Sequence, residues 1–206
     1  MSQIPTPFYC LKDFPNVYEP SEDTHLFLDA LEKEQQYIVN KQPLFICEIG
    51  SGSGILITAL ATMLKGHCCC FATDVNPEAC KVTKLTAKMN QSIVESVEMN
   101  LTNMFRCKFD LIIFNPPYVV TDSDEIGGRG LNRAYAGGMS GREIIDKFLN
   151  TLPTILSNSG ACYLLLLKEN NIDEIKELLQ EYGYKNELVI QRKIPGEHLF
   201  VYKFFK

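Results

Sequence analysis

From Pro43 onwards the sequence alternates between short apolar runs, rich in β-branched and aromatic residues, and longer segments with helical periodicity. This alternation constrains the fold most strongly, because strands separated by helices form βαβ units whose mostly parallel sheet is covered by helices on both faces. The expected elements are strands over 44–49, 67–73, 93–99, 109–114 and 161–167 and helices over 55–64, 77–90, 142–152 and 171–182. The last apolar segments, 187–193 and 197–205, have no helix between them, so we expect an antiparallel hairpin at the sheet edge.

The segment 1–40 differs from the rest of the chain. Prolines at positions 5, 7, 15 and 20 predict an irregular arm over 1–20. Ser21 is the expected N-cap of a single helix that runs to about Tyr37 and whose apolar residues form one stripe. We expect this helix to pack on the sheet.

Length and composition narrow the class of protein. A chain of 206 residues suits one sizeable domain, which we expect to span 1–206. The net charge of -5 argues against a general attraction to nucleic acid, and no secretory signal or membrane-spanning run is present. The eight cysteines lack metal-ligand spacing, so we expect free thiols, with the run 68–70 in the core, and no metal site. We expect a soluble protein of the cytoplasm, and also of the nucleus.

The tetrapeptide Asn115-Pro116-Pro117-Tyr118 closes the expected strand 109–114. Two prolines cannot extend a sheet, so the chain leaves it at Asn115, at the carboxyl end of a strand, where ligands bind in open α/β sheets. The amide oxygen of Asn115 and the carbonyl of Pro116 can each accept one hydrogen of a planar –NH2 group, and Tyr118 can stack on the group that bears it. Accepting both hydrogens stabilises the positive charge that develops on nitrogen during displacement. The alternative is a plain strand-ending turn.

A glycine loop, Glu48-Ile49-Gly50-Ser51-Gly52-Ser53-Gly54, joins the first strand to its helix, and Asp74 ends the second strand. The glycines allow a tight turn and a close ligand, and Asp74 can accept hydrogen bonds from both hydroxyls of a ribose. Motifs for a phosphate loop and for a dinucleotide are absent. Glu48 attracts a cation, which favours S-adenosylmethionine with its ammonium and sulfonium. Each feature alone is also compatible with a turn, a helix cap or a surface charge.

The loop 119–141 is long and rich in glycine, so we expect a lid over the site.

Together these motifs resemble those of class I S-adenosylmethionine-dependent methyltransferases of the HemK-type glutamine group, and more narrowly its short eukaryotic and archaeal members. The likeness covers nearly the whole chain, including 17–24, 48–54, 73–78, 114–121, 136–138, 141–143 and 168–171. It implies a seven-stranded Rossmann-like sheet, S-adenosylmethionine as methyl donor and S-adenosylhomocysteine as product. It also implies methylation of N5 of the glutamine in a Gly-Gly-Gln motif of a class 1 translation release factor.

The resemblance further implies roles for single residues. Asn115, Pro116 and Tyr118 would take the substrate amide. The cofactor would be bordered by Asn115 and by Tyr18, Pro20, Thr24, Glu48, Gly50, Gly52, Asp74, Asn100 and Leu101. Family members commonly carry an acid at position 100, but the amide oxygen of Asn100 can also accept from an adenine amino group.

The family also implies an obligate partner, a small zinc-binding activator protein that pairs with the sheet edge near the third strand. The apolar residues of 93–99 have little flanking protection, which is typical of an edge that something covers. A local loop is the alternative cover. Two other functions remain open at this point: a nucleic-acid adenine-N6 methyltransferase, disfavoured by the acidic balance, and a non-catalytic cofactor-binding scaffold.

Overall fold

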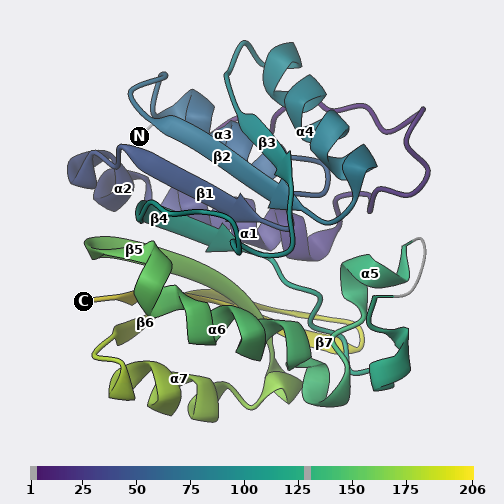
Figure 1. The fold of residues 1–206 in the computed structure, drawn as a ribbon, viewed down its shortest axis with the longest axis vertical. Helices are drawn as coiled ribbons and strands as arrows, with labels where there is room; N and C mark the ends of the chain where they lie inside the picture. Colours follow the sequence, from purple (N-terminus) through teal and green to yellow (C-terminus); the bar gives the residue numbers. More distant parts are fainter. Residues whose placement is uncertain (1–3, 128–130) are drawn as a thin grey trace.

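The computed structural model describes residues 4–127 and 131–206. Over these residues the chain forms one seven-stranded sheet in the order β3-β2-β1-β4-β5-β7-β6 (Figure 1). The strands are β1 (Phe45–Ile49), β2 (Cys69–Asp74), β3 (Glu95–Glu98), β4 (Phe109–Phe114), β5 (Leu156–Leu167), β6 (Lys185–Ile194) and β7 (Glu197–Phe205).

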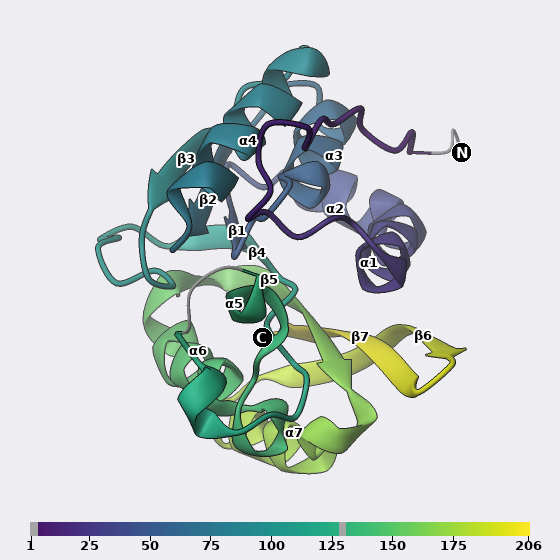
Figure 2. The same cartoon turned by 90° about the vertical axis from the view of Figure 1, so that its right-hand side faces the viewer.

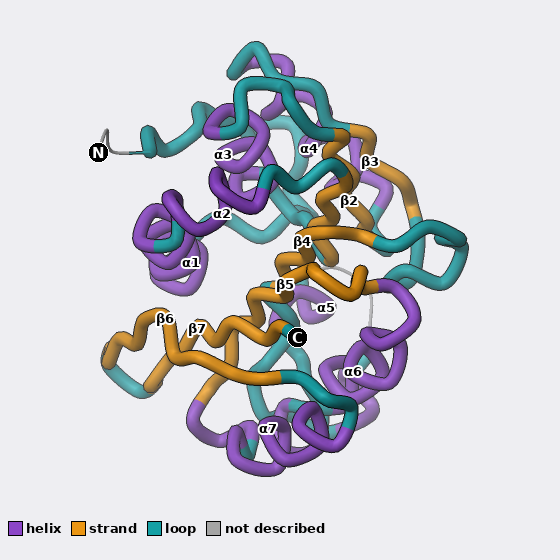
Figure 3. The backbone as a smooth tube through the Cα atoms, turned by 90° about the vertical axis from the view of Figure 1, so that its left-hand side faces the viewer, coloured by secondary structure: helices purple, strands orange, loops and turns teal. Residues whose placement is uncertain are grey.

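Helices cover both faces of this sheet. Figures 2 and 3 show α1, α3 and α4 on one face and α6 and α7 on the other. The α-helices are α1 (Glu22–Lys33), α2 (Gln35–Lys41), α3 (Ile55–Met63), α4 (Pro77–Met89), α5 (Asn132–Tyr135), α6 (Glu143–Ile155) and α7 (Ile172–Glu181), and the 3-10 turns are η1 (Ser123–Glu125), η2 (Met139–Gly141) and η3 (Lys168–Asn170). Within the described residues, no helix is long and apolar enough to cross a membrane.

The strand pairing confirms the predicted fold class. The strands β1 to β5 pair in parallel, whereas β7 pairs antiparallel with both β5 and β6. The strand order reverses between β1 and β4, and a crevice forms at the carboxyl ends of the strands at such a switch point. The hairpin β6–β7 lies where the sequence predicted it, with β7 inside the sheet and β6 at its edge.

The core lies on both faces of the central strands. In β4 every residue except Asp110 is buried, and the last eight residues of β5 are all buried. Asp110 is the charge inside the predicted apolar run, and its carboxylate accepts hydrogen bonds from the backbone of Leu44 and Phe45 at 3.0 and 3.1 Å and from the Ser157 hydroxyl at 3.0 Å. This carboxylate therefore satisfies backbone groups at the amino end of the sheet, away from the crevice.

The predicted single helix over 21–37 is wrong in one respect, because the chain forms two helices that meet at Glu34. Glu34 has φ −89° and ψ 2°, and its buried carboxylate accepts hydrogen bonds from Tyr163 Oη and Lys203 Nζ, both at 2.7 Å. The non-helical backbone accompanies a side chain that turns into the protein toward two residues far along the chain. Ser21 precedes α1, but its side chain makes no capping hydrogen bond.

Other elements differ from the predictions in their ends. The fifth strand begins at Leu156 rather than at position 161, with an irregular register against β4 between Phe109 and Leu111. Helix α6 continues to Ile155, with Pro153 inside it, rather than ending at position 152.

The cysteine run and the segment 119–141 each differ in part from what the sequence predicted. The prediction that positions 68–70 lie in the core is wrong at Cys69, which is exposed, because successive side chains of a strand point to opposite faces. The segment 119–141 contains short helices, η1, α5 and η2, rather than only irregular loop, and its positions 128–130 lie outside the described residues.

Candidate active site

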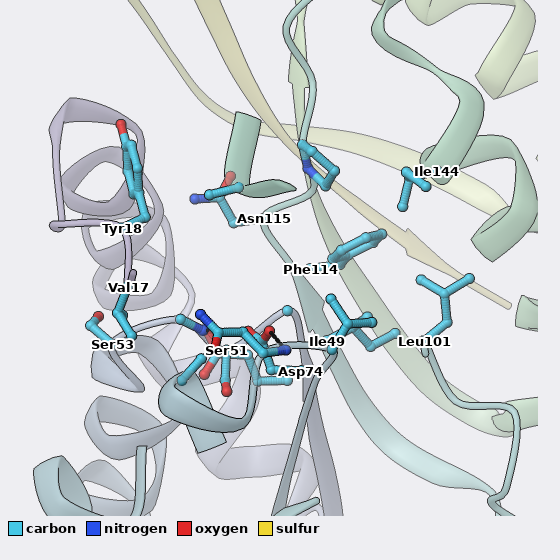
Figure 4. A pocket seen from close by; sticks show the side chains of 18 of the residues that line it. Val17, Tyr18, Ile49, Ser51, Ser53, Asp74, Leu101, Phe114, Asn115 and Ile144 are labelled. Carbon is cyan, nitrogen blue, oxygen red and sulfur yellow. Dashed lines mark hydrogen bonds between the residues drawn. The ribbon is translucent and has the colours of Figure 1, made fainter. Parts of the chain in front are cut away.

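A cavity of about 720 Å³ opens at the carboxyl ends of β1, β2 and β4. Its walls come from segments far apart in the sequence. They are the end of the N-terminal arm with the start of α1, the glycine loop after β1, the β2–α4 junction, residues 99–101, the elbow 115–118 after β4, residues 126–127, 134 and 136, and helix α6. In Figure 4, Tyr18 and Asn115 lie toward one end of the cavity and Leu101 and Ile144 toward the other. The cavity is therefore elongated enough to hold two chemical groups side by side.

The predicted site residues are distributed unevenly around this cavity. It is lined by all the residues predicted to border the cofactor: Tyr18, Pro20, Thr24, Glu48, Gly50, Gly52, Asp74, Asn100, Leu101 and Asn115. Within the described part of the chain, Pro116 and Tyr118 are buried and are not lining residues, whereas Pro117 is one. The predicted lid contributes Ile126 and Ala136 among others.

The glycine loop is shaped by its left-handed residues. Gly50 and Gly54 have φ of 64° and 74°, and a Cβ on Gly54 would lie 2.6 Å from the Cα of Thr83 in α4. The loop is bound to the next strand by the Gly52 N–H, which donates to Asp74 Oδ2 at 2.9 Å, while the Asn76 N–H donates to Asp74 Oδ1 at 2.8 Å. Asp74 is thus held at the cavity wall by backbone donors on both oxygens, with a further backbone hydrogen bond from Val75.

Glu48 is a buried acidic residue at the cavity wall. It is 2% exposed, and its Oε2 accepts from the Ile57 N–H in the first turn of α3 at 3.0 Å. Burial raises the pKa of Glu48 well above its ordinary value, and the negative charge of Asp74 adds to this rise while the Ile57 bond opposes it. Within the described residues Glu48 forms no ion pair. A cation in the cavity would compensate this carboxylate.

Asn115 lies where β4 ends and the proline pair forces the chain out of the sheet. Its Nδ2 donates to Asp23 Oδ2 at 2.8 Å, and Asp23 in the first turn of α1 is 6% exposed. Its Oδ1 is buried and, within the described residues, has no hydrogen-bond partner. An unpaired buried acceptor at a cavity wall is costly unless a ligand donates to it.

We call the region around Asn115 and Asp23 the acceptor end of the site. Tyr118 connects it to the β6–β7 hairpin. Its hydroxyl donates to Glu197 Oε2 at 3.5 Å, and burial together with the charges of Asp23 and Glu197 raises the pKa of Tyr118. Burial and the charge of Asp23 also raise the pKa of Glu197, while the Tyr118 bond lowers it. Tyr118 is therefore a neutral hydroxyl at physiological pH.

Asn170 connects the elbow to the base of the lid. This fully buried residue donates from Nδ2 to the carbonyls of Tyr118 at 2.9 Å and Ser140 at 3.0 Å, and its Oδ1 accepts from Leu167 N–H at 2.6 Å. Gly141 packs so closely here that a Cβ would lie 2.0 Å from the Tyr118 carbonyl oxygen. The elbow, the lid and the end of β5 are thus one bonded unit.

The sequence predictions did not assign Asp23, Glu197 or Asn170 to the site. Asp23 lies within the resemblance segment 17–24, and Asn170 lies within the segment 168–171. Both residues therefore belong to segments that resemble the family, but the sequence predicted no role for either of them in the site. Glu197 carried no signal, because only the sheet order brings the β6–β7 hairpin beside the elbow.

The comparisons with known proteins agree with this geometry. The sequence matches the family described as Methyltransferase small domain over residues 19–134. It is 40% identical over 198 residues to Methyltransferase HEMK2 of Homo sapiens, covering 94% of this chain and 91% of the relative. It is 33% identical over 215 residues to the eRF1 methyltransferase catalytic subunit mtq2 of Schizosaccharomyces pombe, covering 95% of this chain and 92% of the relative.

The fold has solved relatives as well. A chain of the E. cuniculi Mtq2-Trm112 complex matches with a TM-score of 0.69 and 29% identity, covering 93% of this chain and 99% of that one. These matches confirm the resemblance to HemK-type methyltransferases that the motifs predicted. The chain belongs to the methyltransferase small domain family.

Proposed function

We propose that residues 1–206 form a single-domain S-adenosylmethionine-dependent methyltransferase that methylates N5 of the glutamine in the Gly-Gly-Gln motif of a class 1 translation release factor. The observation that carries this proposal is that Asn115 lines the same cavity as Glu48 and Asp74, while its buried Oδ1 has no hydrogen-bond partner within the described residues. Relatives that span most of this chain's length include an eRF1 methyltransferase catalytic subunit, and more distant ones are named release factor glutamine methyltransferase. These names favour a protein amide over an adenine as the methyl acceptor, and the substrate's role in translation favours the cytoplasm.

The cavity suits the proposed cofactor. Glu48 offers a buried, uncompensated carboxylate for an α-ammonium, and Asp74 offers two oxygens for ribose hydroxyls. Asn100 and Leu101 would border the adenine, and Tyr18 the methionine end. When bound, S-adenosylmethionine supplies an electrophilic methyl group on a positively charged sulfur.

The chain's own contribution to the reaction is alignment and charge stabilisation. Asn115 Oδ1 would accept one hydrogen of the substrate –NH2 group, and the Pro116 carbonyl would accept the other, so that the nitrogen lone pair faces the methyl carbon. The amide nitrogen would take up the methyl group as the sulfur leaves with the bonding electrons, and one N–H proton would then be released to solvent. The two acceptors stabilise the positive charge that nitrogen carries before that proton leaves. Among the described residues of the predicted lid, Ile126 and Ala136 line the cavity, and the parts of the lid that carry them would close over the bound groups and exclude water.

The test is methyl transfer from labelled cofactor to a release factor, comparing wild type with Asn115→Ala. Loss of one preorganised hydrogen-bonding group at a reacting centre costs about 10²–10³-fold in rate, so we expect nearly complete loss of glutamine methylation with cofactor binding largely kept. Asn186→Ala, which removes an exposed amide on β6, is the matched control and should retain the wild-type rate. Equal rates for the two variants, or label found on nucleic acid instead, would refute the proposal.

We also propose that a small zinc-binding activator protein pairs with β3 as an obligate partner. This four-residue strand ends the sheet, and the exposed apolar side chains Ile93, Val97 and Met104 lie on or near it, exposed by 83%, 39% and 73%. The E. cuniculi structure of this fold is of an Mtq2-Trm112 complex. Co-purification with the activator should be lost in Val97→Glu and kept in Leu188→Glu, an equally exposed position on the opposite edge strand β6.

A further inference from the structure

The hydrogen bond between Asp23 and Asn115 fixes the orientation of the Asn115 side-chain amide. It decides whether the oxygen or the nitrogen of that amide remains for the substrate. A carboxylate is an acceptor only, so it can bind the Asn115 side chain through Nδ2 and not through Oδ1. The observed contact is Nδ2 to Asp23 Oδ2 at 2.8 Å, and it leaves Oδ1 as the buried atom without a partner. The elbow alone does not impose this choice, because the two ends of an asparagine amide have the same shape.

Asp23 is itself held in place. It lies in the first turn of α1, where the free N–H groups favour a negative charge, and the hydroxyl of Thr24 donates to its Oδ1 at 3.4 Å. Its neighbours Glu22 and Asp29 bond to Arg192, whereas Asp23 forms no ion pair within the described residues. Its remaining neighbours at the acceptor end are Tyr18, Tyr118 and Glu197. No basic group therefore competes with Asn115 for this carboxylate among the described residues.

We infer that Asp23 is a positioning residue that makes the acceptor end select a carboxamide over a carboxylate, so that glutamine is accepted and glutamate is rejected. The inference rests on the proposed function and names a determinant of its specificity. With Nδ2 bound to Asp23, the acceptor oxygen Oδ1 is the atom of the Asn115 amide that remains for an incoming group. The –NH2 of glutamine donates to that oxygen, whereas a glutamate oxygen would face it without a proton between them and beside the charge of Asp23.

Asp23→Asn tests the inference with little change in shape. An amide at position 23 can donate or accept, so Asn115 can bind it with either end, and Nδ2 becomes free to point into the cavity. The wild-type chain, saturated with S-adenosylhomocysteine, should bind a release factor with glutamine in its Gly-Gly-Gln motif about 100-fold or more tightly than the same protein with glutamate there. In Asp23→Asn this ratio should fall at least about tenfold. Glu22→Gln, which removes the adjacent exposed charge, should keep the ratio within about twofold.

A second variant separates orientation from folding. Asp23→Asn combined with Asn115→Asp exchanges donor and acceptor, so that an acceptor oxygen again faces the cavity, and the preference for glutamine should return. The Asn115→Asp variant alone places two carboxylates together, and it should lose the preference for glutamine over glutamate. An unchanged ratio in Asp23→Asn, or no return of the preference in the exchanged pair when both variants melt as single transitions, overturns the inference.

A substrate-free measurement distinguishes a failure of the inference from a failure of the proposed function. In ¹⁵N-labelled protein the Nδ2 protons of Asn115 should show the shift of a bond to a carboxylate, and Asp23→Asn should move that signal while Glu22→Gln should not. Unmoved Asn115 signals in Asp23→Asn would overturn the inference. If the signal moves but neither form of the release factor binds the wild-type chain, the proposed substrate is wrong and the Asp23–Asn115 arrangement stands.

Discussion

Glu48→Gln is the substitution whose effects on stability and on cofactor binding should have opposite signs. Glutamine has nearly the same shape and retains an oxygen that can accept from the Ile57 N–H, which lies 3.0 Å from Glu48 Oε2. What the substitution removes is a negative charge on a side chain that is 2% exposed. The empty protein should gain from this loss, since burying an uncompensated charge is costly.

The pH dependence gives the sign of the stability effect. Burial raises the pKa of Glu48 in the folded protein well above the ordinary value of 4.5, which applies to the unfolded chain. At any pH between the ordinary and the raised pKa, the folded protein therefore binds more protons at Glu48 than the unfolded chain does. The free energy of unfolding contributed by Glu48 therefore falls as pH rises through that window, and Glu48→Gln does not show this fall. The variant should become more stable relative to wild type as pH rises from about 4.5.

Cofactor affinity should move the other way. A hydrogen bond to a charged partner contributes about 1.5–3 kcal/mol, so losing the carboxylate should weaken S-adenosylmethionine binding by about 10- to 150-fold at neutral pH. Binding of an ammonium requires the ionised carboxylate, so wild-type affinity should rise with pH through the raised pKa and binding should release a proton. Part of this dependence should remain in the variant, because burial also raises the pKa of Asp74.

Calorimetric titration in two buffers of different ionisation enthalpy measures both affinity and proton release, and thermal melts of the empty protein measure stability. Glu95→Gln, at an exposed position on β3, is the control and should change neither quantity. If Glu48→Gln bound the cofactor as tightly as wild type, or if the empty variant were less stable above pH 5, Glu48 would not be the buried counter-charge of the cofactor.

Two further substitutions test how the scaffold holds the site. Lys203→Met removes the cation 2.7 Å from the buried Glu34 carboxylate and should cost about 3–5 kcal/mol of the free energy of unfolding, measured by urea titration. A side chain at a left-handed backbone position such as Gly141 (φ 64°) costs about 1–2 kcal/mol of the free energy of unfolding. Gly141→Ala should cost more than this, because the new Cβ would also lie 2.0 Å from the Tyr118 carbonyl oxygen. Gly183→Ala, with φ 83° and no atom within 4 Å of the added Cβ, should show only the backbone cost, and equal losses in the two glycine variants would contradict this account.

The fold could be predicted because its signals are local. Proline pairs, glycine loops and apolar periodicity each act within a few residues, and they placed the strands, the helices and the hairpin close to their observed positions. The break at Glu34 could not be predicted, since its cause is a carboxylate that meets Lys203, 169 residues away in the sequence. Tertiary contacts of this kind override local helix propensity and leave no periodic pattern.

The same distinction applies to the active site. Glu48, Asp74 and Asn115 each end a strand beside a turn with recognisable chemistry, so their places at one sheet edge follow from the order of the strands. Asp23 comes from a helix that precedes the sheet, and nothing in its surroundings in the sequence distinguishes it from Glu22. Only the packing of α1 against the sheet brings it to Asn115, 92 residues along the chain.

This separation has a consequence for how the acceptor end forms. The proline pair directs the elbow out of the sheet, but it leaves the Asn115 amide free to turn either way. The direction of the amide is set only when α1 packs on the sheet and brings the Asp23 carboxylate to Nδ2. A change that loosens α1 without touching the cavity, such as Leu26→Ala in its fully buried face, should therefore weaken the preference for glutamine over glutamate as well as the stability. The N-terminal helix is part of the specificity of this site, although the chemistry occurs at the end of β4.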